Sequence, residues 1–242
     1  MSQRNHSYLA NRSIHLPQNV VTTKRFRHGA ALSQRTRGLD KTEQGSFAPP
    51  ETWYEPEEER KDGGSYRIVV QPPGDGFRHI LTPQQIRDRL SELPDWMLEP
   101  LEVVQLSQMT RKKRSFPCYG LQWGSTLYLY PIEESLTEYY GRPPKPAQMN
   151  EARMFGGCWV HTRQDDWRLE WTEAAIRDYY LNNILIHELG HLLDNRNRSH
   201  VDRERYAEWF AIEHGYRASR RADETAEQRK NPRTVVRRHH GK

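Results

Sequence analysis

The sequence lacks any long hydrophobic run. No stretch approaches the roughly 18 apolar residues that a membrane-spanning helix needs, and the N-terminus lacks the apolar centre of a secretory signal. Only 35% of the 242 residues are hydrophobic, and the mean hydropathy is -1.01. We therefore expect a cytoplasmic protein that makes no membrane contact.

Cysteine is also scarce. The two cysteines, Cys118 and Cys158, lie far apart in the sequence and show no C-x-x-C spacing. A disulfide framework or a cysteine-rich zinc site is therefore not expected. We expect two reduced and mostly buried thiols.

Acidic residues are missing from the start of the chain. Residues 1–39 contain seven Lys or Arg and no Asp or Glu, whereas residues 40–62 contain eight acids and three bases. Residues 217–242 contain nine bases and three acids, which leaves a net charge of −3 for residues 63–216. The basic pI of about 9.2 therefore belongs to the two ends of the chain.

These shifts in composition indicate three regions. Residues 1–62 show no sustained period of 2 or 3.6, and they contain too few apolar residues to offset the entropy of ordering the segment. We expect a disordered N-terminal arm over 1–62, an α+β domain over 63–216, and a basic disordered tail over 217–242.

Short alternating segments and turn residues outline the central domain. Thr82 followed by Pro83 is a typical helix start, and a helix of about three turns should follow. The proline-rich segment 141–148 predicts a loop, and the pair at 158–162 and 167–171 predicts a hairpin. The strands that we expect lie at 66–70 and 77–81 (around a turn at 71–76), 101–107, 125–132, 158–162 and 167–171.

Two helices should close the domain. Residues 173–194 contain no proline and should form one long helix after Thr172, with a stripe of side chains spaced three or four residues apart. Ser199, with Asp202 three residues later, resembles the start of a second helix.

The long helix contains the motif His187-Glu188-Leu189-Gly190-His191. Residues at i and i+4 stand one turn apart, so His187 and His191 can each offer a ring nitrogen to one Zn²⁺ ion. Glu188 points about 100° round the helix and can reach a water held by the metal, whose pKa zinc lowers towards 7. Glu188 would then act as the general base, while Gly190 leaves the site uncrowded.

A third ligand is available in the second helix. Glu204 and Glu208 are again four residues apart, and a short loop could fold their helix back onto the first. Glu204 would complete two histidines and one carboxylate, which leaves a fourth position open for water. Glu208 could accept a hydrogen bond from a ligand histidine. The other candidates for the third ligand are Glu208 itself, His200, Asp202 and Asp194.

This pair of motifs, HELGH followed by Glu204-Arg-Tyr-Ala-Glu208-Trp-Phe-Ala, resembles the gluzincin branch of zincin-type zinc metallopeptidases and is similar to the ImmA/IrrE-type and M48-type patterns. The resemblance implies a zincin-like fold, with a small mixed or antiparallel sheet, a long HExxH helix and a second C-terminal helix. It implies that His187, His191 and Glu204 bind zinc, that Glu188 is the base and that Glu208 supports a histidine.

The resemblance also implies where a substrate binds. In zincin-like folds an edge strand before the metal helix pairs with an extended substrate, and the hairpin at 158–171 is the candidate for this strand. The metzincin pattern fits less well, because its glycine and third histidine would fall at Asp194 and Asn197.

Two functional classes follow from these observations. The first is a zinc-dependent peptidase that acts on a peptide or protein substrate. The alternative is a non-catalytic or regulatory zinc-fold protein that contacts nucleic acid weakly through its basic tails. The motif favours the peptidase.

Overall fold

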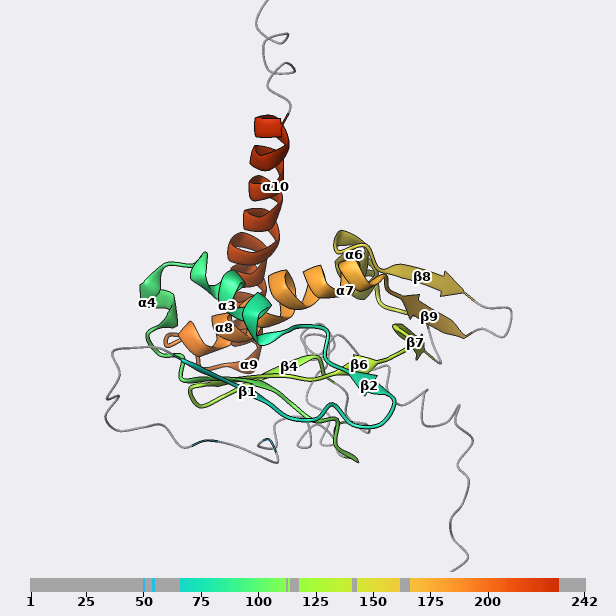
Figure 1. The fold of residues 1–242 in the computed structure, drawn as a ribbon, viewed down its shortest axis with the longest axis horizontal. Coiled ribbons are helices and arrows are strands. Elements are labelled where there is room, and N and C mark those ends of the chain that lie inside the picture. The colour runs from blue at the N-terminus through green and yellow to red at the C-terminus, as the bar shows by residue number, and fades with distance from the viewer. Residues whose placement is uncertain are drawn as a thin grey trace, which may run out of the picture.

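The computed structural model describes residues 50, 54, 66–111, 113, 118–140, 143–161 and 166–230. This part of the chain is a mixed α+β structure with small β-sheets and several helices (Figure 1). The expected α+β class is therefore confirmed. None of the helices described combines the length and the apolar character that a membrane crossing requires.

Most of the segment 1–62, where we expected a disordered arm, lies outside the described residues. Tyr54 is one of the two exceptions. Its hydroxyl donates a hydrogen bond to Gln105 Oε1 at 2.8 Å, and the Arg67 guanidinium lies 5.0 Å from the centre of its ring. Tyr54 is therefore in contact with the central domain.

A four-stranded sheet forms the base of the domain. Its strand order is β1-β3-β5-β4, with β1 (Arg67–Val70), β3 (Val103–Leu106), β5 (Thr126–Leu129) and β4 (Gly120–Trp123). The first three are parallel, and β4 runs antiparallel to β5 at one edge. The sequence had predicted β1, β3 and β5 but not β4.

Two smaller sheets complete the strands that the structure describes. β2 (Phe77–Arg78) pairs with β6 (Ile132–Glu133), and β7 (Thr137–Tyr140), β9 (Trp167–Glu170) and β8 (Cys158–His161) form an antiparallel sheet in that order. The predicted hairpin is confirmed by the pairing of β8 with β9.

The strands on either side of the turn at 71–76 form, but they do not pair with each other. β1 pairs with β3, and β2 pairs with β6. Pro72 and Pro73 have no N–H group to donate to a ladder, so this segment connects two sheets instead of closing a hairpin.

The first helices pack beside the sheet. α3 (Pro83–Ser91) begins as predicted, with the Thr82 hydroxyl accepting from the backbone N–H of Gln85 at 3.2 Å. A short helix, α4 (Asp95–Leu98), follows. α6 (Pro146–Met154) begins inside the segment 141–148, where a loop was expected. That prediction is wrong from residue 146 on, because proline is well tolerated in the first turn of a helix.

The predicted long helix is present and includes a π-helical segment. α7 (Glu173–Tyr179) starts at the Thr172 cap, the π segment η2 (Tyr180–Ile184) follows, and α8 (Leu185–Leu193) ends the helix. π segments of this kind often lie near functional sites. Here η2 directly precedes the turn that carries His187.

A second helical run follows the predicted Ser199 cap. It comprises α9 (His200–Phe210), the π segment η3 (Ala211–Tyr216) and α10 (Arg217–Lys230). The expectation of a disordered tail from residue 217 is therefore wrong for 217–230. Residues 231–242 lie outside the described part.

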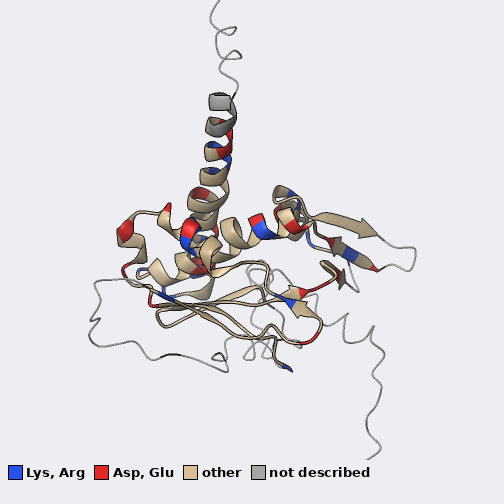
Figure 2. Ribbon diagram, in the orientation of Figure 1, with Lys and Arg blue, Asp and Glu red and all other residues tan. Residues whose placement is uncertain are grey.

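The helix α10 extends away from the body of the domain and carries side chains of both charges (Figures 1 and 2). Arg220 anchors its first turn by an ion pair with Asp178 of α7 at 2.5 Å. The Ala, Arg, Glu and Gln residues that we interpreted as unstructured are also strong helix formers, and they extend the helix that begins at residue 200.

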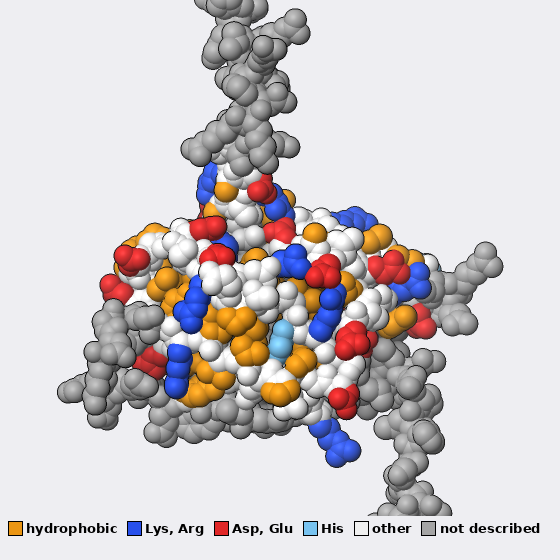
Figure 3. All heavy atoms as spheres, in the orientation of Figure 1, with side chains coloured by type: hydrophobic (Ala, Val, Ile, Leu, Met, Phe, Trp, Pro, Cys, Tyr) orange, Lys and Arg blue, Asp and Glu red, His pale blue; other side chains and the backbone are white. Residues whose placement is uncertain are grey.

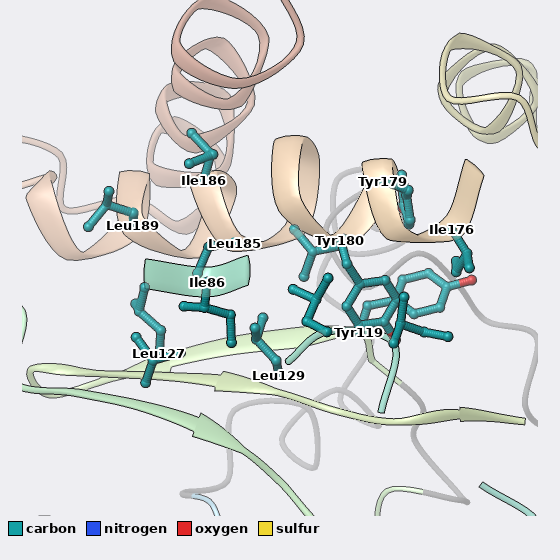
Figure 4. Close-up of a cluster of buried hydrophobic side chains, with 14 of the residues drawn as sticks. Ile86, Tyr119, Leu127, Leu129, Ile176, Tyr179, Tyr180, Leu185, Ile186 and Leu189 are labelled. Atoms are coloured by element: carbon teal, nitrogen blue, oxygen red, sulfur yellow. The ribbon is translucent and has the colours of Figure 1, made fainter. Parts of the chain in front are cut away.

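The core lies between the long helix and the four-stranded sheet. Figure 4 shows Tyr180 and Leu185 on the helix facing Leu127 and Leu129 of β5, with Ile86 of α3 beside them. All five side chains are buried. Burial of each such side chain contributes about 1.5–3 kcal/mol, so this contact fixes the long helix on the sheet.

Candidate metal centre

Two histidines stand one turn apart on α8. His187 Nε2 and His191 Nε2 lie 3.0 Å from each other. His187 is buried and His191 is partly exposed, so the pair opens to solvent on the His191 side. The helical spacing alone therefore directs both ring nitrogens to one point.

The carboxylate of Glu204 completes this group. Its Oε1 lies 3.3 Å from His191 Nε2, its Oε2 lies 3.6 Å from His187 Nε2, and the residue is only 4% exposed. The helix α9 reaches this position because residues 194–199 fold it back against α8. The structure thus brings together the three residues that the sequence suggested as ligands.

The geometry of these three residues fits a metal ion. A tetrahedral ion with bonds of about 2.0–2.1 Å holds neighbouring ligand atoms about 3.3 Å apart, and the observed separations are 3.0, 3.3 and 3.6 Å. Glu204 Oε2 is buried without a hydrogen-bond partner in the described part. A cation would satisfy this oxygen, so the His-His-Glu group could hold a metal ion.

Close packing of the two helices sets the distance between the ligands. A side chain at Gly190 would place its Cβ atom 3.0 Å from Ala207 Cα and 3.1 Å from Phe210 Cβ. Both separations are tighter than ordinary contact. The glycine of the motif therefore lets α9 approach α8 closely enough for Glu204 to reach the histidines.

Charge is coupled across the group. Burial by itself would raise the pKa of Glu204, but the close contacts and charge interactions with His187 and His191 hold it well below its usual range. Burial by itself would lower the pKa of His191, yet the contact with Glu204 and the charge of Glu188 raise it. The carboxylate is therefore ionised, as a metal ligand must be.

Glu188 lies beside this group and faces β4. Burial raises the pKa of its carboxyl to about 7, and the charge of Glu204 adds to this effect. The His191 and Lys113 charges and a hydrogen bond from the Gln122 backbone N–H act in the opposite direction. A buried carboxyl that titrates near neutral pH suits a general base.

The other ligand candidates occupy different positions. Asp194 accepts hydrogen bonds from the backbone N–H groups of Arg196 and Asn197. Asp202 caps α9 together with Ser199. Both carboxylates therefore stabilise the loop and the start of the helix. The side-chain amide of Asn197 also donates a hydrogen bond to Asp194, at 3.1 Å.

His200 and Glu208 flank Glu204 on α9. His200 Nδ1 is 3.6 Å from Glu204 Oε1, and its side chain is 37% exposed, so it lies at the solvent side of the site. Glu208 is half-buried, one turn beyond Glu204. Its role beside a ligand histidine stays a prediction.

Arg203 and the strand β4 also contribute to the site, and neither was predicted from the sequence. Arg203 Nη2 donates to the His191 carbonyl at 3.1 Å and contacts Gln122 Oε1 at 3.4 Å, which ties α9 to α8 and β4. Its only signal in the sequence is its position next to Glu204. The strand β4 was missed because its short segment, Gly120–Trp123, shows too little apolar alternation.

The strand β4 lies next to α8, the helix that carries His187 and His191. The sequence had suggested the hairpin at 158–171 as the substrate-binding strand beside this helix. Gly120 of β4 lies directly against Glu188 and Ile184. The hairpin instead forms a separate sheet with β7. Sequence order alone does not show which strand lies nearest the helix, and the role of the hairpin in substrate binding stays a prediction.

Comparison with models of protein families, with curated proteins and with solved structures found no match to this chain. The geometry and chemistry of the site therefore provide the basis for assigning a function.

Proposed function

We propose that this protein is a zinc-dependent peptidase with a zincin-like fold, in which His187, His191 and Glu204 bind the metal. The observation that supports this most strongly is that ligand atoms of these three residues lie close together. One of the two Glu204 carboxylate oxygens, Oε2, is buried and has no hydrogen-bond partner in the described part. Two imidazoles and one carboxylate are a common ligand set of catalytic zinc, and they leave a fourth position open.

The chemistry divides between the ion and Glu188. A zinc ion in this site would polarise the substrate carbonyl and lower the pKa of a water molecule to about 7. Glu188 takes a proton from the attacking water and gives it to the leaving nitrogen. Burial raises the pKa of this carboxyl to about 7 in the metal-free protein, and the charge of a bound cation would lower it again, which favours the ionised form that a base needs.

The edge of β4 is the proposed binding site for an extended peptide. Antiparallel strands direct alternate residues towards the partner strand, and the Tyr130 N–H donates to the Tyr119 carbonyl. The peptide groups of Gly120 and Gln122 therefore point away from β5, towards the edge beside Glu188. A substrate strand could pair there with its scissile bond near the metal ligands.

Metal analysis of purified variants tests the ligand set. The wild type should contain about one zinc ion per chain, and His187→Ala and Glu204→Ala should lose it. Glu208→Ala should retain zinc with an affinity weakened about 10- to 100-fold, as for a residue that supports a ligand. Zinc retained at full affinity after either ligand substitution would show that the ligands are misassigned.

Hydrolysis assays on the same proteins test the base. Glu188→Gln should keep the zinc ion and lower kcat for an extended peptide by about 10²- to 10⁴-fold, because the amide cannot accept the proton. A Glu188→Gln variant that hydrolyses peptides at the wild-type rate would contradict this role.

A further inference from the structure

Gly120 lies where β4 approaches the metal helix most closely. A Cβ atom added at this position would stand 2.7 Å from Glu188 Oε1, 2.8 Å from Glu188 Cγ and 2.8 Å from Ile184 Cγ2. Side-chain carbons do not normally approach other atoms within 3.0 Å, so something would have to shift. The backbone at Gly120 is not left-handed, and the glycine is therefore required for space and not for conformation.

The atoms around this space determine which group would move. β4 is held by its pairing with β5, and Ile184 is 1% exposed within the core. The Glu188 carboxylate is the end of a longer side chain, and the Gln122 N–H two residues along the same strand holds it in place. An added methyl group would therefore push the carboxylate away from this N–H.

We propose that Gly120 is a positioning residue for Glu188: the space left by its missing side chain is where the carboxylate of the base stands. This inference rests on the proposed role of Glu188 in the reaction. His187 and His191 face Glu204 of α9, so a side chain at 120 displaces the base and leaves the three ligands together.

Gly157 offers a matched control. A Cβ atom there would lie 2.9 Å from two carbons of the Trp171 ring and 3.1 Å from the Ala152 carbonyl oxygen, and its backbone is not left-handed either. The contact is nearly as tight as that at Gly120, but it lies just before β8 and not beside α8. Gly157→Ala therefore reports the effect of crowding alone.

The first test separates metal binding from turnover. Gly120→Ala should bind zinc with a Kd within about twofold of the wild type and lower kcat about 10- to 100-fold, as expected for a misplaced catalytic group. Gly157→Ala should keep both kcat and the Kd for zinc. Unchanged turnover in Gly120→Ala, or loss of its zinc, would overturn the proposal.

The second test does not depend on activity. In a double-mutant cycle on metal-free protein, Gly120→Ala should lower Tm by several degrees when residue 188 is Glu. The loss should be clearly smaller in the Glu188→Ala background, where the two clashing atoms of Glu188 are gone and only Ile184 Cγ2 remains close. If Gly120→Ala alone fails to fold, Glu188→Ala should restore folding. Equal Tm losses in both backgrounds, or no rescue, would overturn the proposal even if the wild type hydrolyses no peptide.

Discussion

Glu138, a buried carboxyl away from the three proposed metal ligands, shows how a single residue can make stability depend on pH. Glu138 of β7 accepts hydrogen bonds from the hydroxyls of Tyr119, at 2.6 Å, and Tyr140, at 3.2 Å. Burial raises its pKa to about 7, and the two tyrosine hydrogen bonds oppose this rise only in part. Tyr119 directly precedes Gly120, so this cluster supports the end of β4 that faces the metal helix.

The raised pKa of Glu138 gives a prediction for stability. As the pH rises from about 4.5 to about 7, the unfolded chain loses this proton while the folded chain keeps it, so the free energy of unfolding falls. Glu138→Gln cannot titrate at this position, so the fall in its free energy of unfolding over this pH range should be smaller than in the wild type by up to about 3 kcal/mol. Urea unfolding of metal-free wild type and variant at pH 4.5, 6 and 8 measures the difference, and parallel pH profiles would contradict it.

Among the helices, the two that carry the metal ligands are also held together by a second contact, at a distance from the ligands themselves. The π segments η2 and η3 meet where the backbone of Gly215 contacts the carbonyl of Asn182, because a Cβ atom at 215 would lie 2.0 Å from that oxygen. The buried Arg89 donates to Asn182 Oδ1 at 2.6 Å and to the His214 carbonyl at 2.5 Å. α3 thus fixes η2 against η3, and with them α8 against α9.

Substitution of Gly215 tests this contact. Gly215→Ala should destabilise the protein by about 3 kcal/mol or more, because the added carbon forces two helix backbones apart. Ala222→Gly on the exposed part of α10 is the control, with an expected cost of about 1 kcal/mol. Denaturant midpoints measure both. A smaller loss for Gly215→Ala than for Ala222→Gly would show that η2 and η3 are not in tight contact.

At the scale of the whole molecule, the charge distribution bears on the nucleic-acid alternative. On the face drawn in Figure 3, the described basic and acidic side chains are interspersed, and hydrophobic side chains gather between them. A nucleic-acid-binding face would require basic side chains gathered on one surface. The drawn face shows no such gathering, and the basic excess of residues 1–39 lies outside the described part.

Removal of both ends separates the two functions. A chain reduced to residues 50–230 should keep its zinc affinity and peptide hydrolysis within about twofold, because the ligands and the helices that position them are retained. Any nucleic-acid affinity should be lost with the ends, and in the full chain it should fall steeply with salt. Zinc binding lost in the shortened chain would show that the ends contribute to the site.

Features that depend on local spacing could be predicted from the sequence. Thr172 and Ser199 begin their helices where predicted, because a capping hydroxyl acts within three residues of itself. The i, i+4 spacing places His187 and His191 on one side of a helix regardless of the rest of the fold. Glu204 was also identified as a ligand candidate, although its spacing left Glu208, His200 and two aspartates as alternatives.

Which distant segments lie side by side could not be predicted from the sequence. Strand pairing and helix packing depend on contacts between residues far apart in the sequence, which no local period encodes. β4 therefore replaced the predicted hairpin beside the metal helix, and a helix replaced the predicted tail over 217–230. The same long-range packing, with Gly190 against α9 and Gly120 against Glu188, sets the separations on which the proposed chemistry depends.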